Sequence, residues 1–403
     1  MKFFNSFFLA KTVKTRLSTF EWLFWAAFAV YYPMVVVYLR FKGYSNTTIG
    51  TILAVNSFMV IIAQPFWGMV CDYIRSIKKV FILCFSLTIC LFVTLPLYKT
   101  ALLTGIAFAA ITFFESGMMP LLDSWVINKV KKEKNLHYGS IRMYGSLGFA
   151  ISVTIVTAVI DRTSMYIIFP AFALSGIMVI LWSLQIKDGI ELAHTKVKSI
   201  NILPLLKNRE YMLFLIFSPI LFAPFRAAFF FLANAMEELG GSQMEYGIAF
   251  AVTALSEVPV FMLSVYLVKR FKSSTIILIA SVFFILRQLI LIMAETPLQL
   301  IFAQATQGLT FGMFLTGTVY YVDKLAPDNL KSTAQTLATA VYYGLGGVLG
   351  SYWGGWAIDN IGLKSMYKIG FAVSIGITFF FLLTLIYSRT RENKIYSYNS
   401  VKQ

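Results

Sequence analysis

Residues 79–97 read KVFILCFSLTICLFVTLPL, a lysine followed by eighteen residues without a charged side chain. A helix of roughly 20 apolar residues crosses the hydrocarbon layer of a bilayer, which is about 30 Å thick. Runs of this length recur along the whole chain and predict an all-α membrane protein with twelve transmembrane helices. The expected spans are 18–39, 47–70, 79–97, 101–128, 139–160, 165–186, 210–236, 244–268, 274–294, 297–322, 332–357 and 364–387.

The composition supports a protein that lies mostly in lipid. Of the 403 residues, 58% are hydrophobic and 13% are charged, with a mean hydropathy of +0.75. A soluble domain carries roughly 25% charged residues, about twice the share found here. The predicted location is therefore the cell (inner) membrane, in a multi-pass arrangement with the lipid bilayer as the main surrounding.

The net charge of +16 does not indicate nucleic-acid binding, because the basic residues gather in short loops on one side. Arg142, Arg226 and Arg287 lie inside apolar runs. Of the other Lys and Arg residues, 25 fall at the N-terminus, in every second loop or at the C-terminus, and 6 fall on the opposite side. Loops rich in Lys and Arg stay in the cytoplasm during insertion. We therefore expect both termini to be cytoplasmic.

Cysteine and histidine residues give no sign of a metal centre or a disulfide framework. Cys71, Cys84 and Cys90 are scattered in or beside apolar runs, and His137 and His194 are the two histidines. These spacings match no common metal-binding pattern. We expect no metal and no cofactor.

The spans divide into two sets of six. The longest connection, 187–209, carries five basic residues and separates an N-terminal six-helix bundle, 1–186, from a C-terminal one, 210–388, followed by a cytoplasmic tail, 389–403. Two bundles related by an internal repeat are typical of secondary transporters.

Two features of single spans also carry predictions. Gly346, Gly350 and Gly354 recur every four residues and should form one small-residue face for close helix packing. Pro219 and Pro224 predict a kinked or broken seventh span.

Ionisable residues inside the apolar runs are the main indication of function. Each charge at mid-bilayer costs roughly 2.5–3.5 kcal/mol, so six unpaired charges would cost on the order of 15–20 kcal/mol, more than the whole stability of a typical protein. They must therefore face one another or water, either as ion pairs that only fix helix packing or as the lining of a solute path. Six ionisable residues within the membrane interior favour a solute path over structural ion pairs. They are Glu115, Asp123, Arg142, Arg226, Glu257 and Arg287.

The loop after the second span, residues 68–79, reads GMVCDYIRSIKK. Gly68, Asp72, Arg75 and the trailing lysines resemble the signature that the major facilitator superfamily carries between its second and third helices. In that superfamily the signature latches helices together at the cytoplasmic face. The resemblance implies a helix-latch role for Gly68, Asp72 and Arg75.

A second resemblance, to the lactose permease and phenylpropionate permease branch, covers nearly the whole chain. Residues 138–145, YGSIRMYG, are similar to the YGxxRxxG element of that branch, in which the arginine contacts substrate. The match implies that Arg142 binds substrate. Residues 120–123, PLLD, resemble the acidic partner of that arginine, and Phe149 falls where the lactose permeases carry a tryptophan that stacks on sugar.

The same branch implies a proton path. Glu257 matches the carboxylate that links substrate to proton, and Arg287 matches the arginine that helps the proton leave. The tenth-span His-x-x-Glu pair of lactose permeases appears here as Gln307 and Thr310. Proton coupling would therefore rest on Glu257, Asp123 or Glu115. Arg226 falls at an acidic position of the seventh span of lactose permeases.

These residues predict a secondary active transporter that imports a small polar organic solute with protons, by alternating access. Asp123, Arg142, Phe149, Glu257 and Arg226 are the expected substrate-binding residues. A sugar, nucleoside or related polyol is the favoured solute class. An aromatic carboxylate remains an alternative, because guanidinium groups match that anion in fork geometry.

Two other functions are weaker. Many exporters of this fold carry a proline and glycine motif late in the fifth span, but residues 145–160 contain no proline. A polytopic membrane enzyme would need clustered Asp, or His with Asp, near one membrane face. Asp328 and Asp359 are isolated, so we expect no enzyme. We expect a monomer with a small-molecule substrate and the proton as coupling ion.

Overall fold

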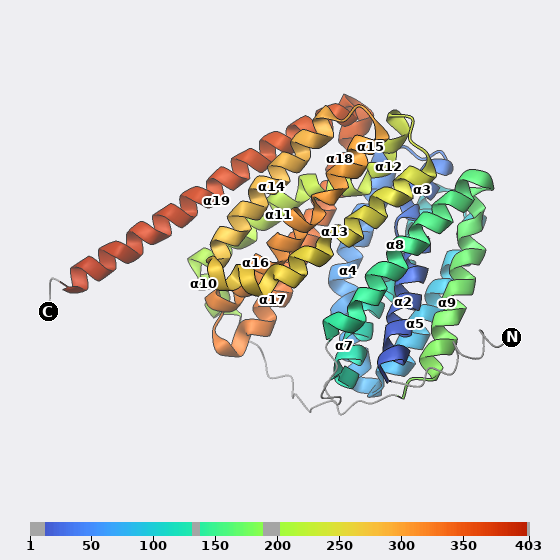
Figure 1. The fold of residues 1–403 in the computed structure, drawn as a ribbon, viewed down its shortest axis with the longest axis horizontal. Coiled ribbons are helices and arrows are strands. Elements are labelled where there is room, and N and C mark those ends of the chain that lie inside the picture. Colours follow the sequence, from blue (N-terminus) through green and yellow to red (C-terminus); the bar gives the residue numbers. More distant parts are fainter. Residues whose placement is uncertain (1–12, 131–137, 188–201, 401–403) are drawn as a thin grey trace. The chain divides into compact units, whose positions relative to one another are not determined.

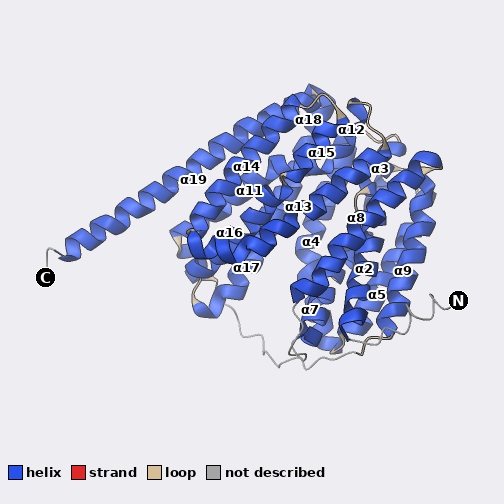
Figure 2. Cartoon of the chain, in the orientation of Figure 1, coloured by secondary structure: helices blue, strands red, loops and turns tan. Residues whose placement is uncertain are grey.

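The computed structural model describes residues 13–130, 138–187 and 202–400, and within these ranges it contains helices and no strand (Figure 2). The contacts divide the chain into two compact units (Figure 1). The first unit comprises Met1–Lys196 and Ala233–Leu255, and the second comprises Val197–Leu232 and Ser256–Gln403.

The helices of the first unit are long and lie along one another. Helix α2 packs on α8 and α9, and α5 packs on α6, α7 and α9. The bounds are α2 Val13–Tyr31, α3 Met34–Phe41, α4 Asn46–Ile74, α5 Ile77–Thr94, η1 Leu95–Leu97, α6 Ala101–Glu115, α7 Met118–Val130, α8 Tyr138–Arg162, η2 Met165–Ile167, α9 Ile168–Leu184 and α12 Leu232–Glu238.

The second unit is built around α11, which packs on α18 and α19, while α14 packs on α16 and α19. The bounds are α10 Leu203–Lys207, α11 Arg209–Phe230, α13 Gln243–Arg270, α14 Ser273–Met293, α15 Pro297–Ala305, η3 Gly308–Gly312, α16 Met313–Leu325, η4 Asp328–Leu330, α17 Lys331–Thr339, η5 Ala340–Leu345, α18 Gly346–Ile361 and α19 Leu363–Ser400. Helix α13 contributes its first part to the first unit and its second part to this one.

Hydroxyl and amide side chains at helix starts explain several of these bounds. A side chain at the N-cap accepts a hydrogen bond from a backbone N–H group that the helix cannot satisfy itself. Ser45, Ser76 and Thr100 do this for α4, α5 and α6, and Asn208 does so for α11. At the start of α15, Thr296 Oγ1 accepts from Gln299 N and Thr296 N donates to Gln299 Oε1, which together form a capping box.

Ten helical stretches in the described chain are long and apolar enough to cross a membrane. Two further expected spans, 297–322 and 332–357, are each interrupted by a π-helical turn. The first is split into α15, η3 and α16, and the second into α17, η5 and α18. Each remaining α-helix in these two regions is shorter than a full span because its hydrogen-bond ladder changes register at the π turn.

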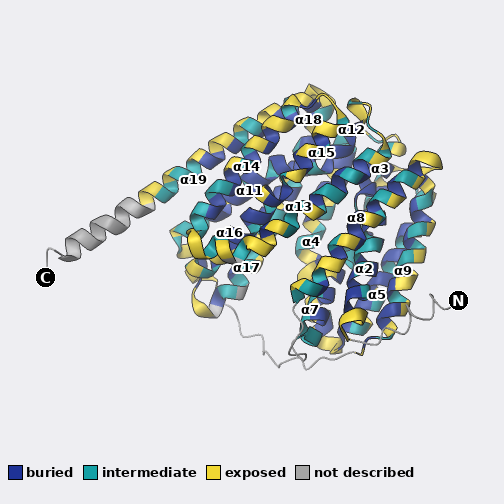
Figure 3. Ribbon diagram, viewed as in Figure 1, coloured by how far each residue is buried: buried dark blue, intermediate teal, exposed yellow. Residues whose placement is uncertain are grey.

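Many of the exposed positions on the helices, yellow in Figure 3, carry large apolar side chains, as a lipid environment requires. Leu102 is 73% exposed, Met262 is 78% exposed and Phe302 is 64% exposed, each on a membrane-length helical region. In water such a surface would drive aggregation, whereas lipid chains solvate it at no cost. The predicted multi-pass membrane character is thus matched by the burial pattern.

Residues 233–255 pack in the first unit, although the sequence places them within the C-terminal bundle. The Asp161 carboxylate accepts hydrogen bonds from Gln243 N at 3.0 Å and Met244 N at 2.8 Å, at the start of α13. Tyr246 donates to Pro33 O at 2.7 Å, and Arg40 forms an ion pair with Glu237 at 2.7 Å. These contacts place the start of α13 with α2, α3 and α8.

The ends of the predicted domains are described only in part. The linker 187–209 lies outside the described residues at 188–201, and its described end holds α10. Helix α19 continues to Ser400, so most of the predicted tail 389–403 is helical, and residues 401–403 lie outside the described chain.

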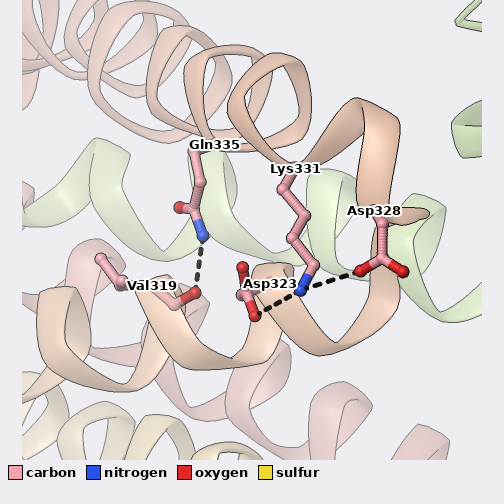
Figure 4. Close-up of polar contacts among 5 residues, drawn as sticks. All are labelled: Val319, Asp323, Asp328, Lys331 and Gln335. Carbon is pink, nitrogen blue, oxygen red and sulfur yellow. Dashed lines mark hydrogen bonds and ion pairs between the residues drawn. The ribbon is translucent and has the colours of Figure 1, made fainter.

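Ion pairs and an amide contact fix the connection between α16 and α17 (Figure 4). The Lys331 ammonium lies 3.2 Å from a carboxylate oxygen of Asp323 and 3.2 Å from one of Asp328. Its hydrogen bonds to Asp328 and Asp323 raise the pKa of Lys331. Gln335 Nε2 donates to Val319 O at 2.6 Å. Gln335 lies one turn after Lys331 in α17, and Val319 lies one turn before Asp323 in α16.

The seventh span is not broken at its prolines. Helix α11 runs continuously through Pro219 and Pro224, and it ends at Phe230, with α12 starting at Leu232. Of the two predicted outcomes at these positions, a kink or a break, the break is absent. Much of α11 is buried, with Phe222 and Phe225 packed against Phe284 of α14. Van der Waals contacts with these rings stabilise the helix, which lacks the backbone hydrogen bonds that the prolines remove.

The predicted small-residue face of α18 is confirmed and packs on α11. A Cβ atom at Gly350 would lie 2.3 Å from Ala223 O, and one at Gly354 would lie 2.9 Å from Ala227 Cβ. A Cβ atom at Gly346 would lie 2.7 Å from Phe222 Cβ. The two helices can approach this closely only because these positions lack side chains.

We expect Gly350→Ala to lower the melting temperature of the detergent-purified protein, because the added methyl would press against a backbone carbonyl. Overpacking of this kind costs about 1–3 kcal/mol. Gly376→Ala in α19 is the matched control, since nothing lies within 4 Å of a Cβ atom there. Equal melting temperatures for the two variants would contradict the close packing of α11 and α18.

Candidate functional site

In the first unit, α2, α7 and α8 bring polar side chains together inside the apolar bundle. Tyr138, the first residue of α8, donates a hydrogen bond to Asp123 of α7 at 2.6 Å. One turn along α8, the Arg142 guanidinium lies over the indole ring of Trp25 on α2, with its Cζ atom 4.1 Å from the ring centroid. The YGSIRMYG stretch therefore supplies both a phenol and a cation to one site.

Arg142 and Asp123 are close without forming a direct ion pair. No carboxylate of the described residues lies within 4.0 Å of the Arg142 guanidinium, so the pairing implied by the family resemblance is absent from this structure. Arg142 acts electrostatically on Asp123 and also on Glu21 of α2. The guanidinium thus attracts two carboxylates electrostatically, without an ion pair to either, while it lies over the ring of Trp25.

Phe149 is placed differently from the expected aromatic platform. Its side chain is 9% exposed, and its ring packs edge-on against Trp25 with the centroids 6.4 Å apart. Trp25 is half-buried. In this arrangement Phe149 packs against Trp25, and Trp25 is the aromatic side chain in contact with Arg142.

Glu115 lies apart from this cluster, at the end of α6. The Tyr31 hydroxyl donates to Glu115 Oε2 at 3.4 Å. Both side chains line a small cavity whose other walls are mostly aromatic, including Phe28 and Phe172. The cavity has a volume of about 10 Å³, close to the minimum that one water molecule needs.

In the second unit, a chain of hydrogen bonds connects Glu257 of α13 to Arg287 of α14. Gln307 donates from Nε2 to Glu257 Oε1 at 3.2 Å and accepts at Oε1 from Arg287 Nη1 at 3.0 Å. Arg287 Nη2 also donates to Gln304 Oε1. Arg287 is 1% exposed, and it meets amide oxygens instead of a carboxylate. The amide of Gln307 thus links the two predicted proton-coupling residues.

The π turn η3 begins directly after Gln307. Gly308 N donates to Ser256 Oγ at 3.3 Å, and a Cβ atom at Gly308 would lie 2.1 Å from Ser256 O. The missing side chain lets η3 approach α13 next to Glu257. π turns occur frequently at functional sites.

Arg226 lies on α11 at 5% exposure among aromatic rings. Its Cζ atom is 4.2 Å from the ring centroid of Phe230 and 4.4 Å from that of Tyr343. The faces of aromatic rings attract cations, by up to about 2 kcal/mol or more when water is excluded. Arg226 and Arg287 make the buried part of the second unit rich in positive charge.

The predicted helix-latch residues lie at the end of α4. Asp72 and Arg75 are exposed, and no atom lies within 4 Å of a Cβ position at Gly68. Arg75 ends the helix in the left-handed conformation with φ of 55°. The geometry places all three on one accessible segment.

Sequence reasoning missed Glu21, Trp25 and Gln304 as members of these clusters. Glu21 is 0% exposed and accepts a hydrogen bond from Trp25 Nε1 at 3.0 Å. Glu21 could have been predicted from the sequence, because it is an acidic residue inside the first apolar run. Gln304 of α15 stands three residues before Gln307, which directly precedes η3, so both amides lie on the same side of this helical segment.

The first-unit cluster can bind a neutral, hydroxylated molecule. It offers carboxylate acceptors, a guanidinium donor, a phenol and an indole face, the usual components of a pocket for a small polar solute. Among the described residues no group of three His, Cys, Asp or Glu side chains could hold a metal ion.

Comparison with known proteins identifies the family. Residues 14–369 match the model of the MFS_1 like family. The maltose permease of Geobacillus stearothermophilus is 28% identical over 356 residues, which cover 88% of this chain and 90% of that protein. The uncharacterized transporter YwbF of Bacillus subtilis (strain 168) is 26% identical over 90% of each chain. The sucrose permease of Escherichia coli is 27% identical over 50% of this chain and 51% of its own length.

Solved structures agree on the fold. A point mutant of the nucleoside transporter NupG superposes with a TM-score of 0.84 at 17% identity, over 92% of this chain and 99% of that one. A POT family transporter superposes with a TM-score of 0.73 at 11% identity, over 94% and 96% of the two chains. The expectations of the major facilitator superfamily and of a transporter instead of an enzyme are confirmed. The chain belongs to the MFS_1 like family and is a multi-pass membrane transporter.

Proposed function

We propose that this transporter imports a sugar or nucleoside together with protons across the cell (inner) membrane, by alternating access. The cluster of Arg142, Asp123 and Tyr138 inside the first bundle is the observation that carries the proposal. Relatives named as maltose and sucrose permeases support the sugar class, and the fold likeness to a nucleoside transporter keeps the nucleoside class open.

The solute-binding role follows from the chemistry of this cluster. Sugar hydroxyls donate to carboxylates and accept from guanidinium and phenol groups, so Asp123, Arg142 and Tyr138 together cover both directions of hydrogen bonding. The half-buried indole of Trp25 offers an apolar surface beside them. Phe149 contributes by holding that indole, and Glu257 and Arg226 are the proposed solute contacts in the second unit.

Proton coupling is proposed to run through Glu257. The carboxylate is connected by the Gln307 amide to Arg287, and a guanidinium that comes close to a carboxylate favours its ionised form. A change in the Gln307 bridge would therefore favour proton uptake in one state and release in another. Glu115, with Tyr31 at its cavity, is the proposed second proton site.

The proposed topology has twelve spans and both termini in the cytoplasm. The segments α15–η3–α16 and α17–η5–α18 support the count, because each continues as helix on both sides of its π turn. The placement of basic residues supports the orientation. We also propose a monomer in which Gly68, Asp72 and Arg75 latch helices at the cytoplasmic face.

An aromatic carboxylate is the second candidate solute. The observation that favours it is Arg226, a buried cation surrounded by the rings of Phe230 and Tyr343. A solute with an anionic group and an aromatic ring would suit that environment.

The solute class can be tested by melting the purified protein with maltose, sucrose, uridine and phenylpropionate. A solute at 100 times its Kd should stabilise the protein by about 2.7 kcal/mol. We expect a rise in melting temperature with a sugar or the nucleoside, and its loss in Arg142→Gln. Arg162→Gln, on the exposed end of α8, is the matched control. A shift with phenylpropionate alone would replace the sugar proposal by the carboxylate one.

The coupling residue can be tested in proteoliposomes. We expect Glu257→Gln to keep solute exchange across the membrane and to lose uphill accumulation under an imposed pH gradient, because the amide cannot carry the proton. Glu295→Gln, at an exposed position, should accumulate solute like the wild type. Uphill uptake by the Glu257 variant would remove Glu257 from the coupling mechanism.

A further inference from the structure

Trp25 on α2 holds the Arg142 side chain in place. The guanidinium lies over the indole ring, with its Cζ atom 4.1 Å from the ring centroid. Among the described residues it has no carboxylate within 4.0 Å that could fix it instead. A long, flexible arginine side chain loses considerable conformational entropy when it is ordered. Stacking on a fixed indole supplies that order before a solute arrives.

Gly145 provides the space in which this contact forms. A Cβ atom at Gly145 would lie 2.4 Å from Trp25 Cδ1 and 2.9 Å from Arg142 Nη1. One turn further along α8, a Cβ atom at Gly148 would lie 2.6 Å from Trp22 O. These two glycines let α2 and α8 approach closely, and the indole of Trp25 fills the resulting gap beside Arg142.

Glu21 in turn fixes the indole. Its Oε2 atom accepts the Trp25 Nε1 proton at 3.0 Å, one turn along the same helix. The side chain is 0% exposed, and its other oxygen, Oε1, is buried without a hydrogen-bond partner among the described residues. An acceptor left unsatisfied in this way costs free energy. A residue used for packing alone would not need to be an acid here.

We propose that Glu21 and Trp25 are positioning residues for solute binding: Glu21 orients the indole, and the indole orients the Arg142 guanidinium toward the solute. The inference rests on the proposed role of Arg142 in the solute site. It adds two residues of the first span to that site, and it gives Gly145 of the YGSIRMYG stretch a physical function.

The first test measures maltose affinity by thermal-shift titration. Trp25→Leu removes the ring and should weaken binding roughly tenfold, which corresponds to about 1.4 kcal/mol. Glu21→Leu removes the acceptor and should weaken binding similarly, whereas Glu21→Gln retains an oxygen acceptor and should stay within about threefold of the wild type. Trp356→Leu, at a 44% exposed position of α18, is the matched control.

The Arg142→Lys background separates positioning from general packing. If Trp25 acts through the guanidinium, Trp25→Leu should change maltose affinity less than about twofold in that background. An equal loss in both backgrounds would show that Trp25 acts independently of Arg142 and would overturn the proposal. Should Trp25→Leu fail to fold, Trp25→Phe keeps a ring face but loses the Nε1 donor to Glu21, so it should weaken maltose binding as Glu21→Leu does, and by less than about twofold in the Arg142→Lys background.

A second test needs no solute. Modification of Arg142 by a dicarbonyl reagent, followed by mass spectrometry, reports how firmly the guanidinium is held. We expect the rate to rise several-fold in Trp25→Leu and Glu21→Leu, and to stay unchanged in Glu21→Gln and Trp356→Leu. Unchanged rates in all four variants would refute the positioning role. If no sugar or nucleoside stabilises the wild type, the proposed solute class fails, while this measurement still decides whether Trp25 orders Arg142.

Discussion

The cost of placing charge inside a bilayer is the constraint on which this structure depends. Two of the three arginines in the apolar spans meet that cost without a close carboxylate among the described residues: Arg142 stacks on Trp25, and Arg287 is bound by the amide oxygens of Gln304 and Gln307. Arg226 lies against the rings of Phe230 and Tyr343. The protein thus stabilises buried cations largely with neutral, polarisable groups.

Neutral partners suit a transporter better than fixed ion pairs would. Separating a buried ion pair leaves two uncompensated charges and costs about 3–5 kcal/mol, whereas a guanidinium that leaves an indole face or an amide oxygen leaves a neutral partner behind. In the proposed mechanism, Arg142 and Arg287 exchange their present partners for a solute or a carboxylate during the transport cycle. A fixed Arg142–Asp123 pair would have to break before each binding event.

The sequence predicted the ten membrane-length helices of the described chain and most of the ionisable residues inside the spans, because both depend on local composition. It could not predict the partners, because side-chain spacing defines a face on one helix while the partner lies on another helix far away in sequence. Glu21 and Trp25 of α2 meet Arg142 more than a hundred residues later. The division into two six-helix bundles did not predict that the start of α13 packs in the first unit. The reason is the same, since its partners Asp161 and Pro33 are distant in sequence.

Glycine connects the packing to the chemistry in both units. Gly145 leaves room for the indole beside Arg142, and Gly308 lets the π turn after Gln307 contact Ser256 next to Glu257. At each site a missing side chain brings a second helix close enough to hold a functional residue. The family resemblance identified Gly145 only as a position of the motif, whereas the structure shows why a glycine is needed there. A methyl group there would overlap the ring that orders the arginine, so the motif encodes a contact between two helices and not only the conformation of one.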